Sequence, residues 1–102
     1  MTLNLIYHIT SRDAWQQAQA AGTYRGDTLA TEGFIHTSTG AQVACTANRF
    51  YHGRADLVLL AIDPTRLSET LRYEAASDGE LFPHIYGPLN LDAVTAVRDF
   101  AP

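Results

Sequence analysis

The segment DLVLLAID (residues 56–63) decides how this chain folds. Between its two aspartates runs an uninterrupted apolar stretch, and turn-forming residues flank it on both sides. An apolar run of this length without polar alternation is typical of a strand whose two faces are both covered. We therefore expect residues 56–63 to form a central strand, around which the rest of the chain is arranged.

A strand followed by a helix is predicted near the N-terminus. Residues 3–10 alternate in polarity as a strand does, with His8 opposite the more apolar face. Thr10 or Ser11 can cap a helix that begins directly afterwards, and Gly22 is placed to end that helix. The segment therefore predicts one strand and one helix ahead of the central strand.

A second strand and a second helix are expected between residue 34 and the central strand. Residues 23–33 are rich in turn formers and indicate a loop, and residues 34–38 form a short strand. A helix is expected over residues 40–52, with Cys45 as a small buried filler. The side chains that point to one common side of this strand are those of Phe34, His36 and Ser38. The apolar stripe of the helix consists of Val43, Ala47, Phe50 and Tyr51.

Extended segments dominate the remainder of the chain. Pro64 opens a short turn or helix, and strands are predicted over residues 71–76 and 92–100. Residues 81–89 are expected to be irregular and extended, because Pro83 and Pro88 lack the backbone N–H that a central strand needs. The order of elements predicts a single α+β domain over residues 1–102, with a twisted, mostly antiparallel sheet and two main helices.

Composition excludes several classes of function. With 102 residues the chain is one domain by length, and a formal charge of −4 argues against binding to duplex nucleic acid. The seven basic residues are all arginine, which excludes Schiff-base lysine chemistry and a Walker-type phosphate lysine. A single cysteine excludes an internal disulfide and fits a cytoplasmic location. No apolar run approaches ~20 residues, so no membrane contact is expected, and we predict a monomer or weak homodimer.

The stretch EGFIHTSTGAQ (residues 32–42) carries the first candidate site. If a helix begins near Gly40, the hydroxyls of Thr37, Ser38 and Thr39 lie beside its free N–H groups, where an anion such as a phosphate binds. The alternative is that Ser38 or Thr39 only caps the helix, as such residues commonly do.

Three histidines on extended segments form the second candidate site. They are His8, His36 and His84, and each is either a structural residue or part of a catalytic group, depending on whether their strands are neighbours. Three imidazoles can hold Zn²⁺ with one open position. However, no HxH or HExxH spacing is present, and no metal is expected.

Polar residues near the third histidine extend this site. Arg72 and Glu74 share one face of a predicted strand, either as solvated charges or, if that face meets the histidines, as an anion ligand and a general base. Tyr86 follows His84 in a segment that Pro83 and Pro88 stiffen. An imidazole beside a phenol suits a ligand with a planar ring or a ribose.

Several blocks of the sequence resemble known families. The blocks IYHIT, EGFIHTS, DLVLLAID, LRYE and GELFPHIYGPL, together with Trp15, resemble the small bacterial and plant proteins grouped as domain of unknown function 952, over nearly the whole chain. That resemblance implies no established activity. The order YHIT, GFIHTS and LVLLAID is also similar to the core of the ADP-ribosyltransferase and RNA 2′-phosphotransferase superfamily, which implies an ADP-ribosyltransferase-like fold.

The second resemblance implies roles for individual residues. A histidine matching His8 binds a ribose hydroxyl of NAD in that superfamily, and a motif matching residues 36–38 lines the nicotinamide side of the pocket. The superfamily places a catalytic glutamate on a late strand, where this chain offers His84 instead. This departure argues against conventional protein ADP-ribosylation and leaves nucleotide binding intact.

Two functional hypotheses from different classes follow. The first is an ADP-ribosyl-transfer-type enzyme that takes NAD or a phosphorylated ribonucleotide as substrate, with phosphate near residues 37–39 and Arg72. His84, Tyr86 or Glu74 would act as acid, base or orienting group. The second is a non-catalytic domain for binding a small ligand or a protein. A metal-dependent hydrolase is a third and more distant alternative.

Overall fold

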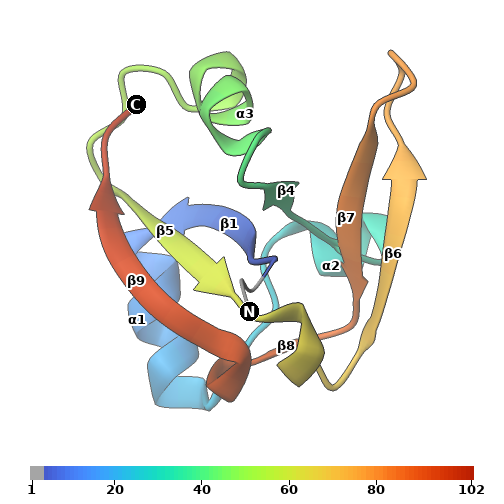
Figure 1. Ribbon diagram of the computed structural model, residues 1–102. Coiled ribbons are helices and arrows are strands. Elements are labelled where there is room, and N and C mark those ends of the chain that lie inside the picture. The colour runs from blue at the N-terminus through green and yellow to red at the C-terminus, as the bar shows by residue number, and fades with distance from the viewer. Residues whose placement is uncertain (1–3) are drawn as a thin grey trace.

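The protein, described by a computed structural model over residues 4–102, contains a four-stranded antiparallel sheet in the order β4–β1–β5–β9 (Figure 1). β5 lies inside this sheet, paired with β1 on one side and β9 on the other. Three of its side chains are fully buried, and they belong to hydrophobic clusters on opposite faces. The prediction of a central, two-sided strand is confirmed. The strands are β1 (Ile6–Ser11), β4 (Ser38–Thr39), β5 (Leu57–Ile62) and β9 (Val94–Phe100).

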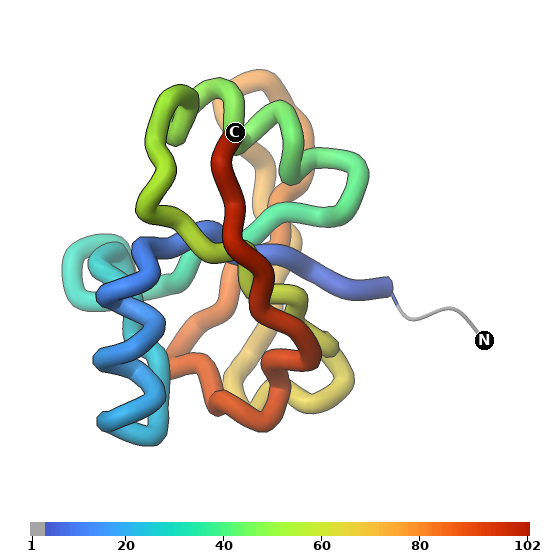
Figure 2. The backbone as a smooth tube through the Cα atoms, turned by 90° about the vertical axis from the view of Figure 1, so that its left-hand side faces the viewer, coloured from blue at the N-terminus to red at the C-terminus, as the bar shows by residue number. Residues whose placement is uncertain are grey.

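A smaller sheet lies on the opposite side of the molecule. Its antiparallel strands have the order β3–β7–β6, and β2 and β8 form a separate two-stranded ladder. Figure 2 shows β9 running across the front while the β6–β7 hairpin lies behind it, so the two larger sheets face each other through the domain. The strands are β2 (Thr23–Tyr24), β3 (Ile35–His36), β6 (Thr70–Ala75), β7 (Leu81–Tyr86) and β8 (Leu89–Asn90).

Three α-helices complete the part of the chain that the structure describes. α1 begins as predicted, because the Ser11 hydroxyl accepts a hydrogen bond from the Ala14 N–H at 3.0 Å. Gly22 ends it in the left-handed region, at a φ of 84°, where a side chain would be strained. The helices are α1 (Arg12–Ala21), α2 (Thr28–Glu32) and α3 (Val43–Phe50), and two short 3₁₀ helices are η1 (Pro64–Arg66) and η2 (Leu91–Ala93).

The fold is therefore α+β with mostly antiparallel sheets, as predicted, but it has three α-helices rather than two in residues 4–102. The expectation that residues 23–33 form a loop is wrong, since β2 and α2 lie within them. Both elements are too short to show a period, and tertiary contacts define them. Tyr24 is buried opposite Leu89, and the Thr28 hydroxyl donates to the Phe34 carbonyl at 2.7 Å.

The predicted strand over residues 34–38 is two strands in different sheets. β3 pairs with β7, β4 pairs with β1, and Thr37 is the only residue between them. Thr37 is buried, and both its N–H and its hydroxyl donate to the Pro83 carbonyl, at 3.2 Å and 2.6 Å. The chain therefore crosses from one sheet to the other at a single residue, and the two sheets diverge from there.

Ser38 and Thr39 do not cap α3, which corrects the predicted anion site. Both are strand residues, and Ser38 pairs with Tyr7 of β1. A turn follows, in which the Gln42 side chain accepts a hydrogen bond from the Thr39 N–H at 3.0 Å, and the helix begins only at Val43. The free edge of β1 has taken the two hydroxylated residues into a sheet instead.

β7 is the centre of the smaller sheet, so residues 81–86 are extended as predicted, while the expectation that this segment is irregular and unsuited to a central strand is wrong. Pro83 lies opposite Tyr73 of β6, and its carbonyl is the one that accepts from Thr37. Because the N and C=O of one strand residue point to the same side, the missing N–H of Pro83 faces the place where β3 has already ended. The proline therefore removes no hydrogen bond to β6.

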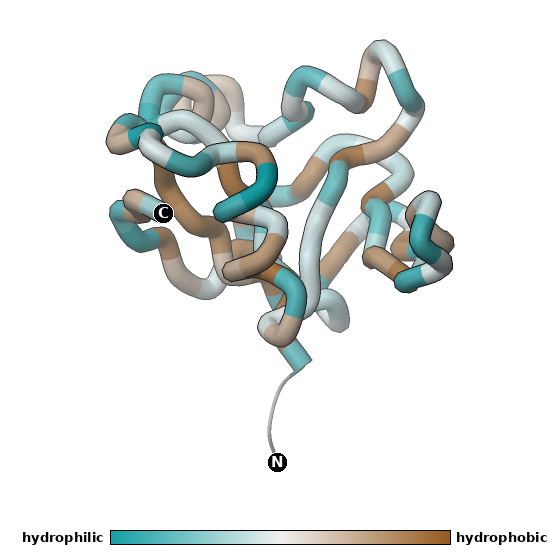
Figure 3. Tube along the Cα trace, turned by 90° about the horizontal axis from the view of Figure 1, so that it is seen from above, coloured by the Kyte–Doolittle hydropathy of each residue, from teal (hydrophilic) through white to brown (hydrophobic). Residues whose placement is uncertain are grey.

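Two residues of α3 differ from their predicted burial. Cys45 is exposed rather than a buried filler, and Phe50 keeps 66% of its surface exposed although it was expected in the apolar stripe. Ala47 is the buried residue of α3, and it packs with Ile9 and Leu57 of the larger sheet. Val43 is partly buried against the same cluster. Figure 3 shows apolar segments gathered along the inner strands and hydrophilic ones along peripheral turns.

Candidate functional site

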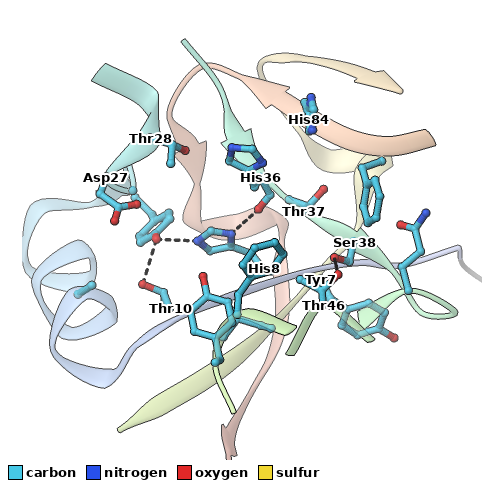
Figure 4. Close-up of a pocket in the computed structure, with 18 of the residues that line it drawn as sticks. Tyr7, His8, Thr10, Asp27, Thr28, His36, Thr37, Ser38, Thr46 and His84 are labelled. Atoms are coloured by element: carbon cyan, nitrogen blue, oxygen red, sulfur yellow. Dashed lines mark hydrogen bonds between the residues drawn. The ribbon is translucent and has the colours of Figure 1, made fainter. Parts of the chain in front are cut away.

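A cleft of about 1080 Å³ lies where the two sheets diverge (Figure 4). Its walls come from β1, α1, the loop after β2, β3, α3 and the β6–β7 hairpin. This volume accommodates a ligand of dinucleotide size. His8, His36 and His84 all line the cleft, each from a different strand. The sheet topology therefore brings the three histidines together, whereas His52 is exposed and outside the cleft.

His8 connects the two sheets through hydrogen bonds. Its Nδ1 lies 2.6 Å from the His36 carbonyl, and its Nε2 lies 2.7 Å from the Tyr24 hydroxyl, which is also 3.0 Å from Thr10 Oγ1 (Figure 4). Burial lowers the pKa of His8 to about 4, although the hydrogen bond to the His36 carbonyl acts in the opposite direction. The ring is therefore neutral at pH 7.

The neutral state fixes the direction of this hydrogen-bond chain. A carbonyl can only accept, so the single ring proton of His8 lies on Nδ1, and Nε2 accepts from the Tyr24 hydroxyl. The Thr10 hydroxyl is then the donor to the Tyr24 oxygen. Burial also raises the pKa of Tyr24 to about 12, which keeps this phenol protonated. Both nitrogens of His8 are thus engaged inside the protein.

His84 is held by a carboxylate. Its Nδ1 lies 2.8 Å from Glu74 Oε1, and the Tyr86 hydroxyl donates to the same oxygen. The bond from Tyr86, and after it the one from His84, lowers the pKa of Glu74 below its ordinary value. The same carboxylate raises the pKa of Tyr86. An ionised Glu74 can only accept, so neutral His84 carries its proton on Nδ1 and presents Nε2 as an acceptor or base.

Aromatic contacts fix the orientation of the His84 ring. Phe34 stacks on it with ring centroids 4.1 Å apart and an interplanar angle of 17°. The His36 ring meets His84 edge-on at 5.2 Å, and Phe34 also contacts His36 at 4.8 Å. Such packing holds an imidazole plane in one direction. Phe34 and His36 therefore belong to one group with His84, as their predicted common side implies.

His36 is the most open of the three histidines. Its Nε2 lies 3.1 Å from Glu32 Oε1 at the end of α2, and half of its side chain is exposed. Its position is fixed by β3, where it pairs with His84 of β7. The two rings therefore lie next to each other in the wall of the cleft.

The remaining predicted site residues have different surroundings. Arg72 lies beside His84 in the sheet, and its guanidinium is 5.3 Å from the Tyr86 ring centre, so Arg72 and Tyr86 support the cluster from outside the cleft lining. The Glu74 carboxylate contacts His84, so this face of the strand does meet one of the three histidines, and the predicted role of Glu74 as a general base stays a prediction. The Thr37 and Ser38 hydroxyls line the cleft but already bond to Pro83 and to Thr46, the latter at 3.2 Å. Thr39 lines a separate, smaller hollow.

Several lining residues were missed by the sequence-based prediction. Tyr24 and Thr10 complete the His8 chain, Arg49 and Phe50 project from α3, and Asp27 precedes α2. Only Phe50 carries a signal that could have been used, because an aromatic residue adjacent to Arg49 at the end of a short helix suits an exposed site as well as a core. The others lack any local pattern.

Neither metal ligation nor membrane insertion is found in the described part of the chain. Within residues 4–102, no three histidine, cysteine, aspartate or glutamate side chains are arranged to hold an ion. No helix in the same range has the length and apolar character needed to span a bilayer.

Comparisons with known proteins identify the family. The model of the family "Protein of unknown function (DUF952)" matches residues 9–97. The crystal structure of protein CC0527 from Caulobacter crescentus is 43% identical, with a TM-score of 0.86, and the match covers 93% of this chain and 84% of that one. The solution NMR structure of CC0527 is 42% identical, with a TM-score of 0.83, 95% of this chain and 84% of that one covered. No curated protein matches this chain. The protein therefore belongs to the DUF952 family of proteins of unknown function, as the sequence blocks predict.

Proposed function

We propose that the cleft binds a nucleotide-type ligand and that the protein is an ADP-ribosyl-transfer-type enzyme acting on NAD or a phosphorylated ribonucleotide. One observation carries this proposal. Three histidines from three strands line a single cleft of about 1080 Å³, and one of them, His84, is oriented by a carboxylate. The divergence of two antiparallel sheets after β3 supports the further proposal of an ADP-ribosyltransferase-like fold.

The His84–Glu74 pair supplies the chemistry in this proposal. With NAD as substrate, the bond between C1′ of the ribose and the nicotinamide nitrogen breaks, and nicotinamide leaves as a neutral molecule with the bonding electrons. An acceptor hydroxyl forms the new bond to C1′, and its proton goes to His84 Nε2. Glu74 stabilises the resulting imidazolium through Nδ1, as a carboxylate does for a general-base histidine. The open nitrogen of His36 is a hydrogen-bond partner for a ribose hydroxyl.

His8 has a positioning role in this proposal. The superfamily resemblance assigns it to a ribose hydroxyl, but both of its ring nitrogens have partners within the protein. A ligand hydroxyl would have to replace Tyr24 at Nε2 to reach it. His8 instead holds the His36 backbone against β1, and so sets the distance between the two sides of the cleft.

A second candidate function is binding of the same ligands without turnover. This candidate is favoured because His84 stands on the late strand at the position where the superfamily has its catalytic glutamate. Glu74 reaches the site from the neighbouring strand, and its Oε1 accepts two hydrogen bonds there. If this carboxylate and His84 only shape the pocket, the protein would bind nucleotides and release them unchanged.

Calorimetry combined with a nicotinamide-release assay tests the proposal. We expect the wild-type protein to bind NAD and ADP-ribose and to release nicotinamide from NAD. His84→Ala and His36→Ala should abolish release while the fold, monitored by circular dichroism, is retained. His52→Ala is the matched control, because His52 is exposed and outside the cleft.

The outcomes separate the two candidates. Binding of NAD without release of nicotinamide supports the non-catalytic candidate. If NAD, ADP-ribose and phosphorylated nucleosides all fail to bind, the cleft is not a nucleotide site and both candidates are wrong. If both cleft variants release nicotinamide as fast as the wild type does, the transfer candidate is wrong.

A further inference from the structure

We propose that the C-terminal end of α3 binds the adenosine-phosphate half of the ligand, with the base on Phe50 and a phosphate at Arg49. This inference rests on the proposed function and adds a second subsite to it. We define the α3 rim as the residues of this end that line the cleft, namely Arg49, Phe50, Tyr51 and Arg54.

The exposure of Phe50 is the first observation. Two-thirds of its surface, 66%, is accessible, and it is the most exposed of the large apolar side chains of the described chain. An exposed phenyl ring on an otherwise polar surface is informative, because packing does not explain it. Phe50 lies in the wall of the cleft, so its free face is available to a ligand there.

Guanidinium groups beside both aromatic rings are the second observation. The Arg49 guanidinium carbon lies 5.5 Å from the Phe50 ring centre, and that of Arg54 lies 5.8 Å from the Tyr51 ring centre. Aromatic rings stack with purine bases, and one guanidinium group can donate two parallel hydrogen bonds to two oxygens of a phosphate. Two adjacent arginine–aromatic pairs on one rim therefore match the two chemical parts of adenosine phosphates.

The two arginines are not equivalent. Arg54 already forms two hydrogen bonds with Asp56, at 3.1 Å and 2.8 Å. Arg49 takes part in none of the ion pairs found within residues 4–102. We therefore assign the phosphate contact to Arg49.

Charge at the other end of the cleft orients the ligand. Glu74, Asp78 and Glu80 line it on the β6–β7 hairpin, which stands across from α3 in Figure 1. These carboxylates repel phosphates and attract a cationic ring. A ligand with a diphosphate and a pyridinium ring is consequently bound with its phosphates at the α3 rim and its reactive ribose near His84.

Calorimetry with ligand fragments tests this subsite. We expect Phe50→Ala to weaken AMP, ADP-ribose and NAD about tenfold, the loss expected for one stacked base, and to leave nicotinamide mononucleotide unaffected. Phe50→Tyr should restore binding. Arg49→Gln should weaken AMP and ADP-ribose, leave adenosine unchanged and reduce the salt dependence of AMP binding. Val97→Ala and Arg98→Gln are matched controls, because both residues are exposed on β9, outside the cleft.

The results distinguish this inference from the proposed function. If NAD binds and Phe50→Ala binds it as tightly, the α3 rim is not the adenosine subsite and the proposed function stands. If AMP binds through Phe50 but nicotinamide is never released, the subsite stands and the transfer activity does not. If AMP, ADP-ribose and NAD all fail to bind, both are overturned.

Discussion

His8 and His84 line the same cleft, yet their surroundings are opposite. Both nitrogens of His8 are engaged, by a backbone carbonyl and a tyrosine hydroxyl, and burial lowers its pKa to about 4. His84 has a carboxylate on Nδ1, while among the described residues no hydrogen bond engages its Nε2. One imidazole is a neutral connector between two sheets, and the other has the arrangement of a general base.

This contrast shows that a shared cleft does not assign a shared role. Both residues are histidines and both line the cleft, so the difference between their roles lies in the hydrogen-bond partners of their ring nitrogens, above all of Nε2. The partner of that nitrogen decides whether an imidazole can exchange a proton with a ligand. If the contrast holds, substitutions at His84 should change activity and substitutions at His8 should change stability.

The largest effect is expected at His84. His84→Gln removes the proposed base and should reduce nicotinamide release by about 100-fold to 10,000-fold, the usual contribution of a general base. The stability of the variant should stay close to that of the wild type, because this ring is not a bridge between the sheets. Steady-state kinetics and urea unfolding measure the two quantities. Equal activity of His84→Gln and wild type would remove His84 from the mechanism.

The next effect is a pH dependence of stability that originates in His8. Below its ordinary pKa of 6.5 the unfolded chain takes up a proton at His8, whereas the folded protein does so only near pH 4. Acidification from pH 6.5 to 4 therefore favours the unfolded state, by about 3 kcal/mol from this residue. This part of the stability is fully present above pH 6.5.

Urea midpoints at pH 4, 5, 6 and 7 for the wild type and His8→Gln measure this effect. The variant should be less stable at pH 7, because the Tyr24 hydroxyl and the His36 carbonyl lose a well-placed partner. It should also lose less stability on acidification. The other titrating groups are common to both proteins and cancel in the difference. Parallel curves for the two proteins would contradict a buried neutral His8.

A smaller effect is expected at Tyr86. Tyr86→Phe removes the hydrogen bond that contributes most to the lowered pKa of Glu74, so this pKa rises. Glu74 is then protonated at higher pH, and the acid limb of the activity profile should move to higher pH. Tyr73→Phe is the control, because Tyr73 lies on the same hairpin and its side chain points to the other face. An unchanged acid limb in Tyr86→Phe would show that Glu74 does not set it.

The smallest effect concerns Cys45, which lines the cleft and is exposed. Cys45→Ser should change the free energy of unfolding by less than about 0.5 kcal/mol, as is usual for a surface substitution. In the wild type, the thiol should react with a chromogenic disulfide without unfolding, and NAD should slow the reaction. A thiol that reacts only in urea would show that this side of the cleft is closed.

Much of the fold could be predicted from the sequence because its signals are local. The apolar run in residues 56–63 gives β5, and Ser11 and Gly22 mark the two ends of α1. The family is likewise evident from short blocks. In each case a single residue type or a local periodicity is enough to predict the element, and the tertiary contacts are consistent with it.

The wrong predictions concern segments whose secondary structure or burial depends on residues that are distant in the sequence. Pro83 argues against a central strand until Thr37 is known to end the neighbouring strand beside it. Ser38 and Thr39 suit a helix cap equally well, and the free edge of β1 recruits them instead. Tyr24 is isolated in a turn-rich segment, and its burial depends on Leu89.

The candidate site was predictable in part for the same reason. His8, His36 and His84 could be named as candidates, and their convergence follows from the topology. The difference between His8 and His84 depends on Tyr24 and on the register that places Glu74 within reach of His84, neither of which is visible in a single segment. The sequence therefore indicates the candidates and not their roles.

The crossing of the chain at Thr37 bears on how this family can vary in length. One residue separates His36 in one sheet from Ser38 in the other, so an insertion or deletion there would rotate the histidine away from its neighbours or detach β4 from β1. The hairpin turn around Gly79 and the loop after α3 have no such constraint. Relatives should accordingly gain and lose residues in those two loops and keep the spacing of residues 34–39 unchanged.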